Sequence, residues 1–71
     1  MDGQYAFCDF FGKRLKRLIC KRGITERRLA GMMGVPEEMV LLWVSGDLMP
    51  DAYQLKKAAK CLVVPYERLL D

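Results

Sequence analysis

Three cysteines are the residues best suited to covalent or metal chemistry in this sequence, and histidine is absent. Cys8, Cys20 and Cys61 lie 12 and 41 positions apart, so they form neither a disulfide framework nor a CxxC metal pair. We expect reduced, buried thiols, with no metal site and no cofactor. Without histidine, imidazole zinc ligands, catalytic triads and histidine general bases are excluded. The chain is therefore not expected to be an enzyme.

Charged side chains form a clearer pattern than reactive ones. The net charge is only +3, yet residues 13–28 carry +7 and residues 29–55 carry −4. A basic stretch followed by an acidic one indicates two faces that attract different partners. The basic stretch is either a solvated helix face or a set of contacts for phosphate groups.

Length and composition restrict the kind of protein. The 71 residues allow one domain, which buries about 60% of the surface that the unfolded chain exposes. A composition of 52% hydrophobic and 30% charged residues excludes a disordered tail and a membrane protein. No run approaches the roughly 18 apolar residues of a membrane span, and residues 1–12 lack the basic segment of a signal peptide. We expect a compact cytoplasmic domain with no membrane contact.

Helical periodicity marks the first element that positions these charges. Apolar residues recur at helical spacing and predict an amphipathic helix over residues 9–22 that ends at Gly23. Residues 1–8 are then expected to be an N-terminal arm. We interpret the aromatic residues of this region as a cover for the core, in preference to a stacking platform for nucleic acid. They are Tyr5, Phe7 and Phe10.

Capping residues mark two shorter helices in the middle of the chain. Thr25 is an N-cap for the first of them, which Gly34 ends. Pro36 suits the first position of the next helix, which Gly46 closes.

Two further helices follow towards the C-terminus. Asp51 is a cap for a helix that runs through about Cys61. Pro65 opens a last short helix that contains Leu69 and Leu70. The sequence thus predicts five helices around one core, an all-α fold.

The spacing within residues 26–43 is typical of a helix-turn-helix. Ala30 is small enough for two helices to cross closely, and Gly34 adopts a positive φ without strain. The apolar positions expected to point into the core are Leu29, Met33, Val35, Val40 and Trp43.

The chain resembles the Cro and lambda-repressor-like (XRE) helix-turn-helix family. The resemblance is carried by "GITERRLAGMMGVPEEMVLLWVSGDLMPD" and "LKKAAKCLVVPYERLL" and covers residues 11–70. It implies that residues 1–71 form a single five-helix, lambda-repressor-like DNA-binding domain. It also implies a small transcriptional regulator that binds an operator in double-stranded DNA through its third helix, as a homodimer.

The same resemblance assigns contacts residue by residue. In the family, exposed residues of the third helix read base edges in the major groove. At those positions this sequence has Glu37, Glu38, Leu41 and Leu42. Phosphate contacts fall near the start of the second helix and after the third, on Thr25, Glu26, Arg27, Arg28 and Ser45.

An alternative function follows from the chemistry of the third helix. No Lys, Arg, Gln or Asn occurs in residues 34–44, and carboxylates at the proposed contact positions oppose attraction to phosphates. The chain would then be an adaptor or regulator-sequestering module that does not bind DNA through this helix. Five successive apolar residues, 40–44, exceed one buried stripe, so Leu41 or Leu42 should be exposed. Leu41 and Leu42 are either extra core against the first or fourth helix or part of a protein-binding or dimer patch, whose residues are then Met39, Leu41, Leu42, Leu48 and Met49.

One departure from the family pattern yields a packing prediction. An Arg in the first helix of family members forms a buried ion pair with a Glu after the third-helix aromatic position. This sequence has Ile19 and Val44 at those two places. Replacing both partners of a buried ion pair by apolar residues is often neutral or stabilising. We therefore predict that Ile19 packs against Val44.

Overall fold

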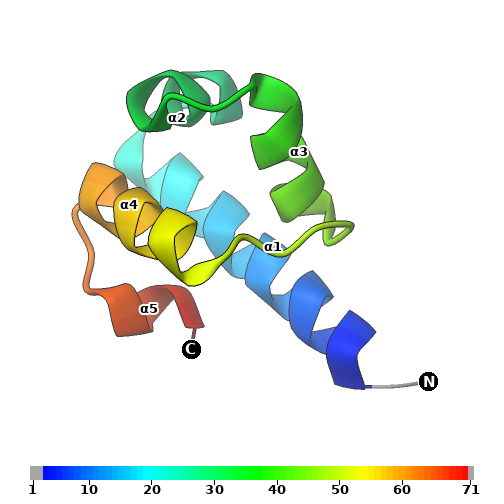
Figure 1. Cartoon of the computed structure of the whole chain (residues 1–71). Helices are drawn as coiled ribbons and strands as arrows, with labels where there is room; N and C mark the ends of the chain where they lie inside the picture. The colour runs from blue at the N-terminus through cyan, green and yellow to red at the C-terminus, as the bar shows by residue number, and fades with distance from the viewer. Residues whose placement is uncertain (1–2, 71) are drawn as a thin grey trace.

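The computed structural model describes the backbone of residues 3–70 and the side chains of residues 10–70. Within this part of the chain every regular element is a helix, as predicted, and no strand occurs. The five helices are α1 (Gly3–Arg22), α2 (Glu26–Met33), α3 (Glu37–Ser45), α4 (Ala52–Leu62) and α5 (Tyr66–Leu70). Figure 1 shows α2 and α3 at one end of the molecule, with α4 and α5 beside the long α1.

The first helix begins earlier than the sequence predicted. α1 starts at Gly3 instead of Asp9, so the backbone of residues 3–8 continues the helix. Residues 3–8 include no proline that would interrupt the helix, and no break separates an arm from α1. Whether Tyr5 and Phe7 cover the core stays a prediction, because their side chains lie outside the described residues.

Phe10 does not cover the core, which corrects one part of the predicted arm. Its side chain is 53% exposed, and the Arg14 guanidinium lies 5.8 Å from its ring centre. The neighbouring Phe11 is buried instead. Successive helical residues point about 100° apart, so the helix that buries Phe11 turns Phe10 outwards.

The predicted caps are formed. The Thr25 hydroxyl accepts a hydrogen bond from the Arg28 backbone N–H at 3.1 Å and begins α2. Asp51 and Gln54 form a capping box at the start of α4. Pro36 differs by one position, because it is the cap residue of α3 in extended conformation and the helix begins at Glu37.

The core lies between α1 and the other helices. α1 packs against α3, α4 and α5, while α2 packs against α3 and α4. Four of the five predicted core positions are buried, and Val35 is partly buried against them. The buried large side chains include Phe11, Leu15, Ile19, Leu29, Met33, Val40, Trp43 and Leu69.

The helix crossing of α1 and α3 depends on Gly12. A Cβ atom at this position would collide with the backbone carbonyl oxygens of Trp43 and Val44. Only a residue without a side chain lets the two backbones approach this closely.

The cysteines are less buried than predicted. Cys20 is an exposed free thiol and Cys61 is a partly buried one. Cys20 follows the buried Ile19 directly, so the helical rotation carries it to the outer face of α1. The Cys8 side chain lies outside the described residues. Among the residues described, no group of side chains is suited to hold a metal ion, and no helix is long and apolar enough to cross a membrane.

Candidate nucleic-acid interface

The turn between α2 and α3 fixes the relative orientation of the two helices. Gly34 ends α2 in the left-handed conformation with φ of 73°, and the Val35 N–H donates to the Ala30 carbonyl at 3.0 Å. Ala30 itself is buried, because its small side chain lies where the helices cross. The predicted helix-turn-helix is present.

The four residues predicted to read bases share the exposed face of α3. Val40 and Trp43 of this helix are fully buried and Met39 and Val44 are partly buried, which turns the four candidate positions outwards. Both candidate leucines are exposed, Leu41 at 46% and Leu42 at 37%, although the sequence required only one of them to be. Glu37 and Glu38 are exposed beside them and form no ion pair with any residue between 10 and 70. The helix therefore presents two carboxylates and two leucines to a partner.

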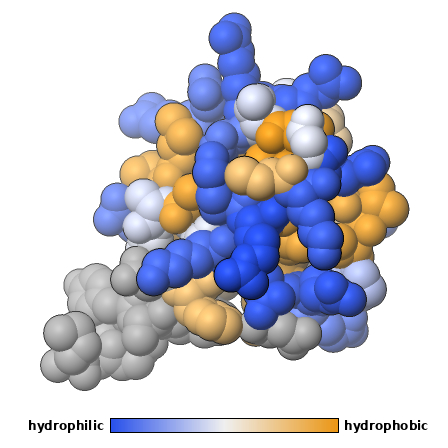
Figure 2. Space-filling model, turned by 180° about the vertical axis from the view of Figure 1, so that it is seen from behind, coloured by the Kyte–Doolittle hydropathy of each residue, from blue (hydrophilic) through white to orange (hydrophobic). Residues whose placement is uncertain are grey.

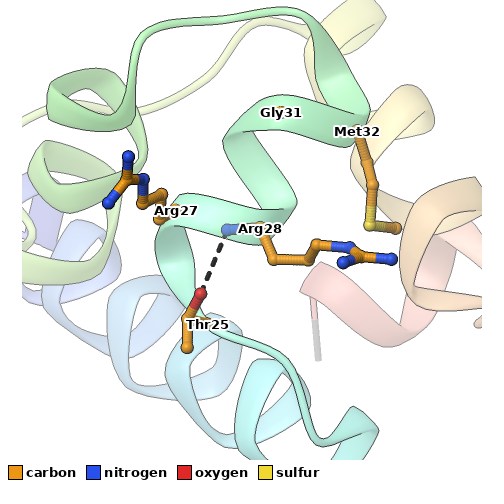
Figure 3. Close-up of a pocket in the computed structure, with 5 residues that line it drawn as sticks. All are labelled: Thr25, Arg27, Arg28, Gly31 and Met32. Carbon is orange, nitrogen blue, oxygen red and sulfur yellow. Dashed lines mark hydrogen bonds between the residues drawn. The ribbon is translucent and has the colours of Figure 1, made fainter.

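The arginines of α2 diverge from one another. Thr25, Arg27, Arg28, Gly31 and Met32 line an open hollow of about 580 Å³. Figure 3 shows the Arg28 side chain extending on the same side as Met32, while Arg27 points in the opposite direction. Both arginines are exposed. Two cations thus flank the N-terminal end of α2, where backbone N–H groups favour an anion.

The negative charge of Glu26, the third candidate carboxylate, is balanced by an ion pair. Its side chain accepts a hydrogen bond from the Lys16 ammonium of α1 at 2.6 Å. This bond is the main reason that the pKa of Glu26 lies below its ordinary value and the pKa of Lys16 lies above its own. Lys16 is the residue that sequence reasoning missed here. Ten positions separate the partners, so no helical spacing could have revealed the pair.

The Ser45 hydroxyl already has acceptors within the chain. It lies 3.0 Å from the Leu42 carbonyl oxygen and 2.9 Å from an Asp47 carboxylate oxygen. A hydroxyl has one proton to donate. A phosphate contact from Ser45 would require this proton to leave its intramolecular acceptors.

The predicted apolar patch is only partly exposed. Leu48 is 42% exposed and lies in the loop after α3. Met39 and Met49 are partly buried against the core, and the Gln54 amide lies 3.5 Å from the Met39 sulfur. The exposed apolar surface of this region is therefore formed mainly by three leucines.

Comparison with known proteins supports the helix-turn-helix assignment. No family model matches the sequence, and no curated protein matches it. Among solved structures, the chain is similar to the restriction-modification controller protein C.AhdI from Aeromonas hydrophila, with 25% sequence identity and a TM-score of 0.90. The match covers 96% of this chain and 99% of that one. This controller protein is of the XRE/Cro-like helix-turn-helix type. The resemblance of the sequence to that family is therefore confirmed.

Proposed function

We propose that this helix-turn-helix chain is a DNA-binding transcriptional regulator that inserts α3 into the major groove. The supporting observation is the structural match to a restriction-modification controller over nearly the whole of both chains. The fold alone does not specify a function. The outward face of α3 and the arginines at the start of α2 supply the chemistry that the proposal requires.

The side chains of α3 favour particular base edges. The Glu37 and Glu38 carboxylates accept hydrogen bonds, and cytosine N4 is the donor that the major groove presents to them. Leu41 and Leu42 are apolar and suit the thymine methyl group. The proposed operator is therefore read through pyrimidine groups.

Phosphate contacts fall to the residues around α2 and after α3. Arg27 and Arg28 carry the charge, while Thr25 and Ser45 offer hydroxyl groups. Because Lys16 already neutralises Glu26, the carboxylates that oppose the phosphates are reduced to Glu37 and Glu38. The remaining repulsion predicts weak binding to non-specific DNA.

A homodimer is part of this proposal. Two protomers would place their α3 helices in half-sites one helical turn apart, which raises affinity by joining two weak contacts. The site of action is the cytoplasm.

The proposal is tested by a backbone-amide NMR titration with a mixed-sequence duplex at about 50 and then 200 mM salt, a range over which phosphate contacts weaken steeply. We expect amide shifts in residues 25–28 and 37–42 that decline as salt rises. Glu37→Gln should strengthen general DNA binding and change base preference, because it removes one repulsive charge. Unmoved amides in both segments would refute insertion of α3.

A second candidate function is favoured by the exposed leucines. Leu41, Leu42 and Leu48 form an apolar surface next to two carboxylates, a combination that fits a basic amphipathic segment of a protein partner. On this hypothesis the chain keeps the fold without reading DNA. The same NMR experiment distinguishes the two functions, because a positively charged amphipathic peptide would then shift the α3 amides and the duplex would not.

A further inference from the structure

The outer face of α1 carries a row of cations on the side away from the core. Lys13, Arg17 and Lys21 follow one another every four residues, so they lie on neighbouring turns of one helical face. All three are exposed. At 1.5 Å of rise per residue, the row extends for about 12 Å.

Among the side chains of residues 10–70, none of the three cations in this row forms an ion pair. No Asp or Glu occurs between residues 10 and 22 of α1. Among residues 10–70 the one ion pair is between Lys16 and Glu26, and it belongs to the side of α1 that faces α2. Like charges four residues apart destabilise a helix, whereas a merely solvated face commonly mixes both signs. A polyanion bound along the row would remove this repulsion.

The row points away from α3. Gly12 marks the side of α1 that contacts α3. At about 100° per residue, Lys13 lies about 100°, Arg17 about 140° and Lys21 about 180° around the helix from Gly12. Figure 2, which views the molecule from behind, shows hydrophilic side chains gathered over the middle of this face. Arg17 and Lys21 therefore lie on the side of α1 opposite to α3, away from a duplex that α3 holds.

We infer that this row, Lys13, Arg17 and Lys21, binds the phosphate backbone of a second DNA segment, so that one chain holds two duplexes together. The inference rests on the proposed DNA-binding function and extends it. A DNA strand presents a regular array of negatively charged phosphates, and three cations on successive turns of one helix face form an array of opposite charge.

The composition of the face favours DNA over a protein partner. Protein interfaces have an apolar core from which lysine is depleted. On the outer face of α1 the uncharged exposed side chains among the described residues are Phe10, which has the Arg14 guanidinium 5.8 Å from its ring centre, and Cys20. Two uncharged side chains among seven exposed ones in residues 10–22 form no apolar core of the kind that protein interfaces bury.

The test measures whether the chain brings two duplexes together. Two 20-base-pair duplexes of the same sequence, one with a donor and one with an acceptor dye, are mixed with the full chain at about 50 mM salt, where phosphate contacts are strong. The variant is Lys13→Gln/Arg17→Gln/Lys21→Gln. The control is Lys56→Gln/Lys57→Gln/Lys60→Gln, which removes the same charge from α4. Circular dichroism verifies the helix content of both.

We expect energy transfer with the wild-type chain and with the α4 control, and its loss with the α1 variant. Anisotropy of a single labelled duplex should still report binding by the α1 variant. For binding of the second duplex to the wild-type chain, the slope of log affinity against log salt should be about −2.7, or −0.9 for each of three phosphate contacts.

Two results would overturn the inference while leaving the proposed function intact. In the first, the wild-type chain binds a single duplex without energy transfer; in the second, the α1 variant bridges the duplexes as well as the wild type does. If the wild-type chain binds no duplex in the anisotropy experiment, the proposed function fails as well. The two failures are thereby distinguished.

Discussion

The Lys16 ammonium lies 2.6 Å from a carboxylate oxygen of Glu26 and connects α1 to the first residue of α2. This contact changes the electrostatics of the proposed interface. A carboxylate at the start of α2 would repel a phosphate approaching the same helix end. Because Lys16 balances the charge of the Glu26 carboxylate, Arg27 and Arg28 are the dominant charges at that end of α2.

Lys16→Gln is expected to weaken DNA binding a few-fold, because the Glu26 charge is then uncompensated. The measurement is fluorescence anisotropy with a labelled duplex at low salt. The double variant Lys16→Gln/Glu26→Gln removes both charges and should bind about as well as the wild type. Equal weakening in the single and the double variant would contradict a role for the pair and would indicate that Lys16 contacts DNA directly.

The same pair predicts a pH dependence of stability. The bond from Lys16 lowers the pKa of Glu26 in the folded chain, so the contribution is present above the ordinary Glu pKa and is lost as the pH falls through the folded value. The pKa of Lys16 is raised in the folded chain. The stability that this shift contributes is therefore present at neutral pH and is lost only as the pH rises into the alkaline range. The effect is small, because Lys16 is well exposed. Titration of the Glu26 carboxyl carbon by NMR should show its pKa returning towards the ordinary value in Lys16→Gln.

Local sequence signals predicted the helices and their caps. The Thr25 cap bonds to a residue three positions away, and the Asp51 capping box has the same span. Such interactions depend on local backbone geometry alone. The sequence prediction placed the start of α1 at Asp9, six residues too late. No proline or helix-breaking residue near Asp9 stops the helix there, so it extends back to Gly3.

Features that depend on helix crossing could not be predicted in the same way. The pairing of Lys16 with Glu26 requires the angle between α1 and α2. The exposure of both Leu41 and Leu42 arises because α1 and α2 cover only the side of α3 that carries Val40 and Trp43. The sequence alone does not show which side of α3 is covered. The candidate base-reading residues were placed on one face by the family resemblance, and their contacts with DNA stay a prediction.

Gly12→Ala and Gly31→Ala are expected to change stability in opposite directions. At Gly12 the new methyl group collides with backbone carbonyls of α3, so the helices must separate at a cost of about 1–3 kcal/mol. Gly31 lies in α2 with no neighbouring atom within 4 Å of an added Cβ, and alanine there should gain about 1 kcal/mol from helix propensity. Urea denaturation of both variants measures the difference. A stabilised Gly12→Ala would contradict the close approach of α1 and α3.

Val63 offers a second test of backbone strain. It ends α4 in the left-handed conformation with φ of 58°, and its side chain is 68% exposed. A non-glycine residue in this region costs about 1–2 kcal/mol, and little buried surface offsets it. Val63→Gly should therefore raise the free energy of unfolding by about 1 kcal/mol.

The matched control for Val63 is the reverse change at another left-handed position. Gly34 has φ of 73° and open space around its Cβ position. Gly34→Val should lose about 1–2 kcal/mol, as measured by thermal unfolding. If Val63→Gly were destabilising instead, the contacts of the valine side chain would outweigh its strain.

The predicted packing of Ile19 against Val44 is tested by a double-mutant cycle. Ile19 is buried in the core, and Val44 is partly buried against the same cluster, so a charge at either site lacks a partner. Ile19→Arg should destabilise the fold by about 3–5 kcal/mol, and Val44→Glu by less, because Val44 is only partly buried. If the two side chains are in contact, the double variant forms an ion pair and recovers part of that loss. Additive effects, measured by urea denaturation, would place Ile19 and Val44 in separate environments.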